Sequence, residues 1–309
     1  MAHDTLLKLG TRRSPLAMAQ AEEARDRLCA AHDWDVGQVE LVPVIASGDR
    51  IQDRPLADIG GKALWTRELD AWLATGRIDA AVHSMKDVET LRPDTLAIAA
   101  ILPRADVRDV LVGADSLGAM PQGARIGTSA PRRAAQMLHH RPDCRIVGMR
   151  GNVATRLGKL AAGDADVTLL AAAGLARLGQ GDVGTVLDTD AFLPAPAQGA
   201  IGIECRADDR RAREWLAAID HEPSRTTVMA ERAVLAGLGG TCHSPIAMLS
   251  VWEGDTLRLH VSLFSADGAQ RVDGVWRGEA GNIAGCTAFA RALLRDAPEA
   301  VATLFSAEP

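Results

Sequence analysis

The side chains best suited to chemistry in this chain directly follow one short apolar segment. Residues 78–82 read as a buried strand, and Ser84, Lys86 and Asp87 come immediately after it. In an open α/β sheet, groups just past the carboxyl end of a strand line the ligand crevice. A carboxylate there, beside an ammonium group and a hydroxyl, can stabilise a developing cation or relay protons. The alternative is a solvated Lys-Asp pair that caps the next turn.

Arginines recur where a predicted strand gives way to a predicted helix. They occur in residues 11–15, 127–133 and 150–156. A cation in the first turn of a helix opposes the helix dipole and costs about 0.3–1 kcal/mol at the surface. Three such placements indicate a bound anion, held by backbone N–H groups and guanidinium groups. We therefore expect a small ligand with several carboxylates between two lobes, with ordinary ion pairs as the alternative.

A glycine-rich loop near the end of the sequence carries a cysteine at its tip. Gly239, Gly240 and Thr241 follow a predicted helix and precede Cys242. Glycine gives the backbone freedom to bring a side chain close to a partner. A thiol that faces arginines is reactive because nearby cations favour the thiolate. A structural cysteine is the alternative, and a nucleophile pair with the adjacent His243 is disfavoured by geometry.

The elements that position these groups form two α/β blocks and one α+β block. Strands and helices alternate through the first two blocks, which favours sheets of mainly parallel strands. Predicted strands of these blocks are 6–9, 39–45, 80–82, 109–112, 125–127, 145–149, 167–171 and 200–204, and predicted helices are 15–31, 62–75, 132–140 and 152–163. In the last block we expect helices at 224–238 and 288–294 and antiparallel strands at 246–251, 256–264 and 270–276.

Crossings near residues 102–105 and 192–199 divide the chain into domains. We expect lobe 1 at 1–102 and 198–219, lobe 2 at 103–197, and a smaller C-terminal α+β domain at 220–309. Two lobes joined by two crossings would place a cleft between them, with hinges near residues 102–105 and 193–198.

Composition excludes several classes of protein. The chain has 309 residues, a net charge of −6 and 3% aromatic residues, which argues against a nucleic-acid binder. No run of about 18 apolar residues indicates a membrane span, and the first residues lack the features of a signal peptide. The five scattered cysteines show no metal-ligand spacing, so we expect a cytoplasmic protein without a metal site.

Together these segments resemble the porphobilinogen deaminase (hydroxymethylbilane synthase) family over nearly the whole chain. The motifs that carry the resemblance are 10–17, 60–62, 82–87, 150–153, 198–200 and Cys242 in its glycine loop. The resemblance implies two periplasmic-binding-protein-like lobes and a C-terminal domain. It also implies a transferase that condenses four porphobilinogen molecules head to tail, with loss of ammonia, to give 1-hydroxymethylbilane in haem and tetrapyrrole biosynthesis.

The resemblance further implies a dipyrromethane cofactor, attached to Cys242 by a thioether, as the primer of chain growth. It assigns Asp87 as the catalytic residue. The residues that it implies for cofactor binding are Ser84, Lys86, Asp87, Ser129, Arg132 and Arg133. Those that it implies for substrate binding are Arg12, Ser14, Gln20, Lys62, Arg150, Arg156, Arg177 and Arg206, with Gln20 helping to place Arg12 and its neighbours. A monomer that passes its product to the next enzyme of the pathway is expected.

The chain departs from the pattern of bacterial members at Asp58, Trp65, Ala130-Pro131 and Thr241. We expect these changes to affect single contacts and the rate rather than the activity. Two other functions stay open at this point. One is a two-lobed protein that binds small carboxylates without chemistry, and the other is a thiol-dependent hydrolase with His83 as its base.

Overall fold

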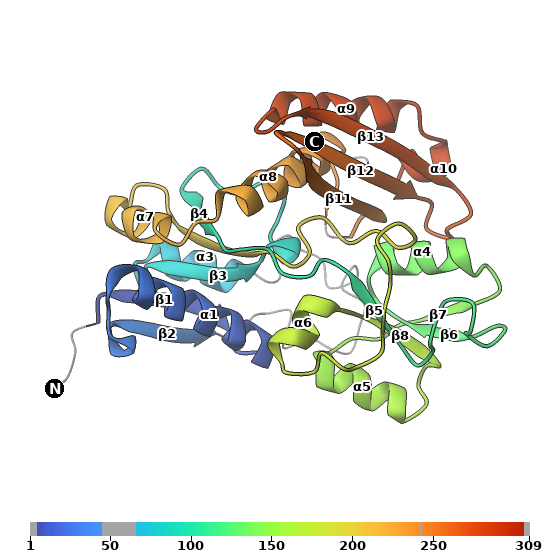
Figure 1. Cartoon of the computed structure of the whole chain (residues 1–309), viewed down its shortest axis with the longest axis horizontal. Coiled ribbons are helices and arrows are strands. Elements are labelled where there is room, and N and C mark those ends of the chain that lie inside the picture. The colour runs from blue at the N-terminus through green and yellow to red at the C-terminus, as the bar shows by residue number, and fades with distance from the viewer. Residues whose placement is uncertain (1–4, 45–65, 242, 306–309) are drawn as a thin grey trace. The chain divides into compact units, whose positions relative to one another are not determined.

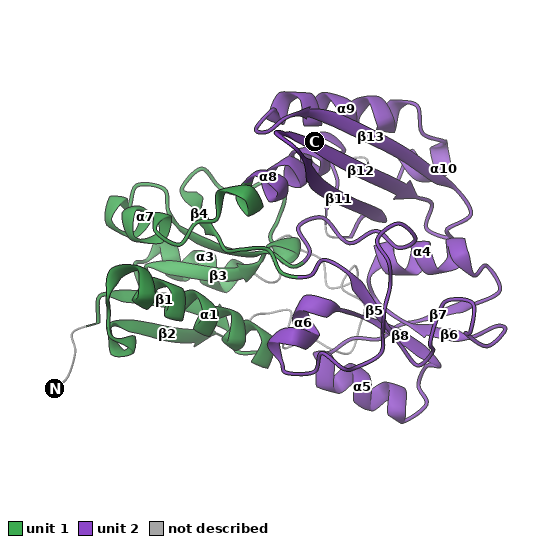
Figure 2. Ribbon diagram, viewed as in Figure 1, with its two compact units in different colours: residues 1–54, 59–105, 199–225 green, residues 55–58, 106–198, 226–309 purple. Residues whose placement is uncertain are grey.

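A computed structural model describes residues 5–44, 66–241 and 243–305. Within these residues the chain forms two compact units, coloured green and purple in Figure 2. The first unit ends at Ala105 and resumes over Gly199–Arg225. The second unit contains Asp106–Gln198 and the residues from Thr226 onward. The second unit therefore joins the predicted lobe 2 with the predicted C-terminal domain, and the division into three domains stays a prediction.

Lobe 1, the first unit, is a sheet with helices on its faces (Figure 1). Its strand order is β2-β1-β3-β10-β4. The strands are β1 (Leu7–Arg12), β2 (Val39–Val44), β3 (Ala80–Ser84), β4 (Leu96–Ile101) and β10 (Ile201–Arg206). The helices are α1 (Pro15–His32), α3 (Arg67–Ala74) and α7 (Arg210–Ala217), with short 3₁₀ turns at Val36–Gln38 and Met85–Asp87. One face of the sheet packs on α1 and α7 and the other on α3.

Lobe 2 repeats this arrangement within the second unit. Its strand order is β7-β6-β8-β5-β9. The strands are β5 (Asp109–Val112), β6 (Arg125–Gly127), β7 (Arg145–Val147), β8 (Val167–Ala171) and β9 (Thr185–Val186). The helices are α4 (Pro131–His140), α5 (Val153–Ala161) and α6 (Ala172–Arg177). Each lobe thus has three parallel strands, then one reversed strand, then an edge strand.

The reversed strand is the feature that sequence periodicity does not reveal. In lobe 1, β10 runs antiparallel to both β3 and β4, and in lobe 2, β5 runs antiparallel to both β8 and β9. The other four strands of each sheet share one direction, so the expectation of mainly parallel sheets is confirmed apart from this insertion. Each reversed strand is the first one after the chain crosses into its lobe.

The C-terminal domain is an antiparallel sheet covered by helices, as predicted. The strands β11 (Ile246–Glu253), β12 (Thr256–Phe264) and β13 (Arg271–Glu279) form it in that order. The helices are α8 (Glu222–Gly237), α9 (Ile283–Arg295) and α10 (Glu299–Ala302). Apolar residues of α8, α9 and the sheet form one core. No helix of the described residues is both long and apolar enough to cross a membrane.

A fully buried glutamate attaches the second crossing to the C-terminal domain. The Glu231 carboxylate accepts hydrogen bonds from the Ala197 backbone N–H at 2.6 Å and from the Ser250 backbone N–H and hydroxyl at 2.9 and 2.7 Å. Pro194 accepts a further bond from the Met248 backbone N–H. The crossing residues 193–198, which we expected to act as a hinge, are therefore fixed within the second unit.

Candidate active site

The carboxyl ends of β1 and β3 bring several predicted site residues to one edge of the lobe 1 sheet. These two strands are parallel neighbours, so the segments that follow them lie at the same edge. Arg12 is the last residue of β1, and Ser14 caps α1 by accepting a hydrogen bond from the Ala17 backbone N–H. Ser84 is the last residue of β3, and Asp87 lies in the 3₁₀ turn that follows.

The Asp87 carboxylate is half-buried, and no residue of the described chain forms a hydrogen bond or an ion pair with it. Its turn is fixed by the neighbouring Met85, which is 1% exposed and whose backbone N–H donates to Ala200 at 3.0 Å. A side chain at Gly202 would collide with the Met85 sulfur, so the absence of a Cβ there lets Met85 pack in its present position. The carboxylate is thus held in place by packing and keeps its capacity to face a cation.

Gln20 is hydrogen-bonded to another predicted site residue, Ser84. Its side chain is 4% exposed, and its Nε2 donates to the Ser84 Oγ at 2.8 Å. The amide thus reaches across to β3, and the part of Gln20 in placing Arg12 and its neighbours stays a prediction. This contact joins residues 64 positions apart, and local sequence patterns contain no signal for it.

A buried ionic cluster, absent from the sequence analysis, lies on the α3 face of the lobe 1 sheet. Arg92 donates through Nε and Nη2 to both oxygens of Glu204, each at 2.9 Å. His83 Nε2 lies 3.2 Å from the same carboxylate. Burial opposes ionisation of Glu204, but His83 and Arg92 outweigh it and lower the pKa of Glu204 to about 2.

In lobe 2, the two arginines that begin α4 form a buried ion triad. Arg132 and Arg133 are 6% and 5% exposed, and both donate to the fully buried Asp109 on β5 at 2.6 Å. They also donate to the carbonyls of Leu193 and Leu169, respectively. Burial opposes ionisation, but the two guanidinium charges lower the pKa of Asp109 below its ordinary value. The arginines are therefore fixed by the protein itself, with the adjacent Ser129 between β6 and α4.

The other predicted site arginines of lobe 2, Arg150, Arg156 and Arg177, also follow strands that end at one edge of its sheet. Asn152 caps α5 by accepting from the Thr155 backbone N–H at 2.9 Å, and Arg150 and Arg156 flank this cap. Arg156 Nε donates to the Gly151 carbonyl at 3.0 Å. Arg177 is the last residue of α6, the helix that follows β8. Guanidinium groups from three strand–helix junctions thus belong to one edge of the sheet.

Arg206, another predicted site residue, lies at the edge of the lobe 1 sheet opposite to Ser84. Because β10 is reversed, Ile201 pairs with Ser84, whereas Cys205 pairs with Ala80 at the start of β3. Arg206 follows, about 13 Å or more from Ser84 along the strand. Its guanidinium donates to the carbonyls of Leu73 and Ile78 and pairs with Asp209. Arg206 thus joins α3 to the amino edge of the sheet, and its contact with substrate stays a prediction.

Two predicted residues, Lys62 and Cys242, lie outside the described residues, as do the departures Asp58 and Trp65. Of the other departures, Ala130 begins α4 without a side-chain cap. Thr241 accepts a hydrogen bond from the His243 backbone N–H at 3.1 Å, so its hydroxyl takes part in the loop itself.

The donors at the two edges match the chemistry of a dipyrromethane group, whose side chains are acetates and propionates. Guanidinium and hydroxyl groups bind carboxylates, and guanidinium does so through two parallel hydrogen bonds. A half-buried carboxylate such as Asp87 suits pyrrole N–H groups, which become strong donors when the ring is positively charged. The described residues therefore fit this cofactor.

Comparison with known proteins agrees with this chemistry. The family model described as porphobilinogen deaminase, dipyromethane cofactor binding domain, matches residues 7–214, and the model for the C-terminal domain of that enzyme matches residues 225–289. The chain is 56% identical to the porphobilinogen deaminase of Sphingopyxis alaskensis over 98% of both chains. It is 46% identical to that of Nitrobacter winogradskyi, over 98% of this chain and 97% of the relative.

A plant relative and a solved structure extend the comparison. The chloroplastic porphobilinogen deaminase of Oryza sativa subsp. japonica is 50% identical over 79% of this chain and 69% of its own. A periplasmic binding protein of Salmonella typhimurium with high arginine specificity matches at 12% identity and a TM-score of 0.40, over 70% of this chain and 92% of its own. On the two family models and the identity to the bacterial enzymes, the chain belongs to the porphobilinogen deaminase family.

Proposed function

We propose that the chain condenses four porphobilinogen molecules head to tail and releases the product as 1-hydroxymethylbilane. Each addition breaks the C–N bond of one aminomethyl group, releases ammonia and forms one C–C bond between pyrroles. A final water molecule supplies the hydroxyl group of the product. The product then passes to the next enzyme of tetrapyrrole biosynthesis. Membership of the porphobilinogen deaminase family supports this reaction.

Asp87 is the residue that we assign to the chemistry, and its position is the single structural observation that carries the proposal. Loss of ammonia from porphobilinogen leaves a positive charge spread over the pyrrole ring. A preorganised carboxylate stabilises such a charge without having to reorganise during the reaction. Asp87 meets this requirement because its turn is fixed by Met85, while no described residue neutralises it.

The arginines and hydroxyls of both lobes are the residues that we assign to carboxylate binding. In lobe 1 they are Arg12, Ser14, Ser84, Lys86 and Lys62, and Gln20 orients Ser84. In lobe 2 they are Ser129, Arg132, Arg133, Arg150, Arg156 and Arg177. The pairing of Arg132 and Arg133 with Asp109 leaves a net positive charge at the start of α4. This charge suits the acetate and propionate groups of the cofactor.

Cys242 is the residue that we assign to covalent attachment of dipyrromethane through a thioether. When bound, the cofactor supplies the pyrrole carbon at which chain growth begins. The chain's own residues hold its carboxylates and place Asp87 beside the reacting ring. A growing product needs movement between the units, and we place the hinges at 105–106 and 198–199. Gln198 supports these positions, because its Nε2 donates to Val107 and Asp109 and so ties both crossings to lobe 2.

The two other functions suggested by the sequence are less well supported. A hydrolase would need an accessible histidine base, but His83 is 6% exposed and lies against Glu204. A protein that only binds small carboxylates would gain nothing from the Asp87 carboxylate, because its charge repels such ligands. We further propose that the protein is a cytoplasmic monomer that binds neither nucleic acid nor membranes.

The proposal is tested by the intact mass of the purified, denatured protein, followed by peptide mapping. We expect an excess equal to two condensed pyrrole units on the Cys242 peptide, and none in a Cys242→Ser variant. Incubation of the native protein with porphobilinogen should give the linear tetrapyrrole and free ammonia. An unmodified chain that releases no ammonia from porphobilinogen would contradict the proposal.

A further inference from the structure

One guanidinium group connects the segment that carries Asp87 to two other parts of lobe 1, strand β10 and the start of α3. Arg92 lies five residues after Asp87, and its side chain is 9% exposed. Its hydrogen bonds go to five acceptor atoms: two oxygens of Glu204 at 2.9 Å, and single oxygens of Glu89 at 2.7 Å, Asp70 at 2.6 Å and Thr66 at 3.3 Å. These residues belong to β10, to the segment after the 3₁₀ turn, and to the first turn of α3 and the residue before it.

The segment from Ser84 to Arg92 is therefore held at both ends. At the first end, Gln20 donates to Ser84, and the Met85 backbone N–H donates to the carbonyl of Ala200, which directly precedes β10. At the second end, the fork of Arg92 binds Glu204 on β10 itself. Asp87 lies between these anchors in a single 3₁₀ turn. A catalytic carboxylate has to stay within about 0.5 Å of its productive position, which requires support from the surrounding residues.

We propose that Arg92 is a positioning residue, which fixes the Asp87 turn through its bidentate contact with Glu204. This inference rests on the proposed role of Asp87. Replacing Arg92 frees the second end of the segment and leaves three carboxylates, those of Glu204, Glu89 and Asp70, without their shared cation. The turn then samples positions from which Asp87 no longer faces the reacting ring.

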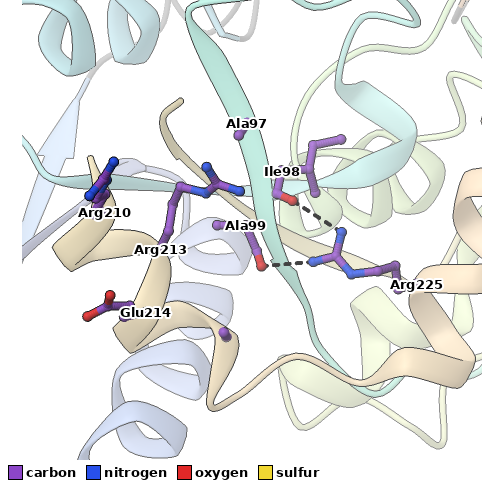
Figure 3. Close-up of a pocket in the computed structure, with 8 residues that line it drawn as sticks. Ala97, Ile98, Ala99, Arg210, Arg213, Glu214 and Arg225 are labelled. Carbon is purple, nitrogen blue, oxygen red and sulfur yellow. Dashed lines mark hydrogen bonds between the residues drawn. The ribbon is translucent and has the colours of Figure 1, made fainter. Parts of the chain in front are cut away.

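Arg225 offers a matched control in the same lobe. Its Nε donates to Asp220 at 2.6 Å, and its Nη atoms donate to the carbonyls of Ile98 and Ala99 at 3.2 and 2.8 Å (Figure 3). It therefore uses a complete fork, as Arg92 does, but on the edge strand β4, two strands away from β3. It lines a depression of about 460 Å³ that contains none of the predicted site residues. We expect its replacement to lower the stability of lobe 1 and to leave the position of the Asp87 turn unchanged.

The experiment compares the holoenzymes of Arg92→Leu and Arg225→Leu with the wild type. For Arg92→Leu we expect kcat to fall at least tenfold with a change in KM of less than threefold. Hydrogen exchange of the peptide that contains Asp87 should accelerate by a similar factor. For Arg225→Leu we expect kcat within twofold of the wild type and faster exchange only around β4. Equal kcat values in the two variants, or unchanged exchange at Asp87 in Arg92→Leu, would overturn the inference.

A second variant covers the case in which Arg92→Leu does not fold. Arg92→Lys keeps the charge but cannot form the fork, so we expect a folded enzyme with kcat reduced several-fold. Wild-type kcat in Arg92→Lys would overturn the inference. A wild-type protein that does not consume porphobilinogen would instead contradict the proposed function, and the exchange measurement would still report on the role of Arg92.

Discussion

Lobes 1 and 2 have the same arrangement of strands, and the reversed strand of each carries a fully buried carboxylate. The two carboxylates differ in their distance from the carboxyl edge of the sheet. Asp109 on β5 pairs with Ala171, the last residue of β8, and so lies at the carboxyl edge of its sheet. Glu204 on β10 pairs with Ala81, three residues before the end of β3. Glu204 therefore lies about 10 Å from the carboxyl edge of its sheet, because each strand residue spans about 3.3 Å.

This difference in distance from the edge distinguishes carboxylates that stabilise the fold, Asp109 and Glu204, from the one that we assign to the reaction, Asp87. In lobe 2 the carboxylate at the edge, that of Asp109, forms ion pairs with both Arg132 and Arg133. Two positive charges against one negative charge leave this edge with a net positive charge. In lobe 1 the buried carboxylate is paired below the edge, and a second carboxylate, Asp87, stands at the edge with no ion pair to a described residue. The same fold can thus present cations from one lobe and an anion from the other.

The largest effect that we expect concerns the carboxylate of lobe 2. Asp109→Asn removes the charge shared by two buried guanidinium groups, so it should lower the free energy of unfolding by about 3–5 kcal/mol. Urea denaturation followed by circular dichroism measures this. The control is Asp166→Asn, which breaks the exposed pair with Arg125 and should have a much smaller effect. Equal effects of the two substitutions would mean that burial of the triad does not matter.

The carboxylate at the edge of lobe 1 should affect turnover instead of stability. Asp87→Asn keeps the shape of the side chain and removes its charge, so kcat should fall by about 10²–10³. Circular dichroism and the thermal midpoint should stay unchanged. Steady-state release of ammonia measures kcat, and Asp94→Asn, exposed on the following loop, is the control. Near-normal turnover in Asp87→Asn would assign the charge stabilisation to another group.

The deep carboxylate of lobe 1 gives a dependence of stability on pH. The pKa of Glu204 is lowered from 4.5 to about 2 in the folded chain. Such a group stabilises the fold above pH 4.5, and the contribution is lost as the pH falls toward 2. The wild type should exceed Glu204→Gln by about 3 kcal/mol at pH 7, and the gap should close on acidification below pH 4.5. A gap that stays constant down to pH 3 would show that Glu204 is not preferentially ionised in the fold.

The smallest effect on stability that we expect concerns a single hydrogen bond at the end of β3, which has no counterpart at the end of β8. Ser84 ends β3 and accepts from Gln20, whereas the equivalent residue of β8 is Ala171. Gln20→Leu should therefore cost about 1 kcal/mol of stability, the net contribution of one hydrogen bond. Gln20→Glu, which keeps an acceptor for the Ser84 hydroxyl, serves as its control. A loss of several kcal/mol in Gln20→Leu would mean that the amide does more than orient Ser84.

Local sequence patterns predicted the elements whose character is set by their own residues. The strands 109–112, 125–127 and 167–171 match the structure residue for residue. By contrast, β4 was missed, because its alanine-rich sequence becomes a strand only by pairing with β10, far away in the sequence. The short helices α6 and α7 were missed as well, since each is at most eight residues long.

The site was predictable where motifs are local and not where partners are remote. The Ser84–Asp87 segment lies at the end of its strand, as expected. The position of Arg206 at the edge opposite to Ser84 could not be predicted, because the direction of a strand is not encoded in its own residues. The role of Arg92 could not be inferred either, because its partner Glu204 is 112 residues away.

The position of β10 also constrains the order in which the chain can fold during synthesis. This strand lies between β3 and β4 and is hydrogen-bonded to both, yet all of lobe 2 is translated before it. At about 5–20 residues per second, a ribosome takes roughly 5–20 s between β4 and β10. For that time the nascent chain exposes two unpaired strand edges, which are sites of aggregation. Lobe 2 can complete its sheet first, so the lobe that begins the polypeptide is the later one to close.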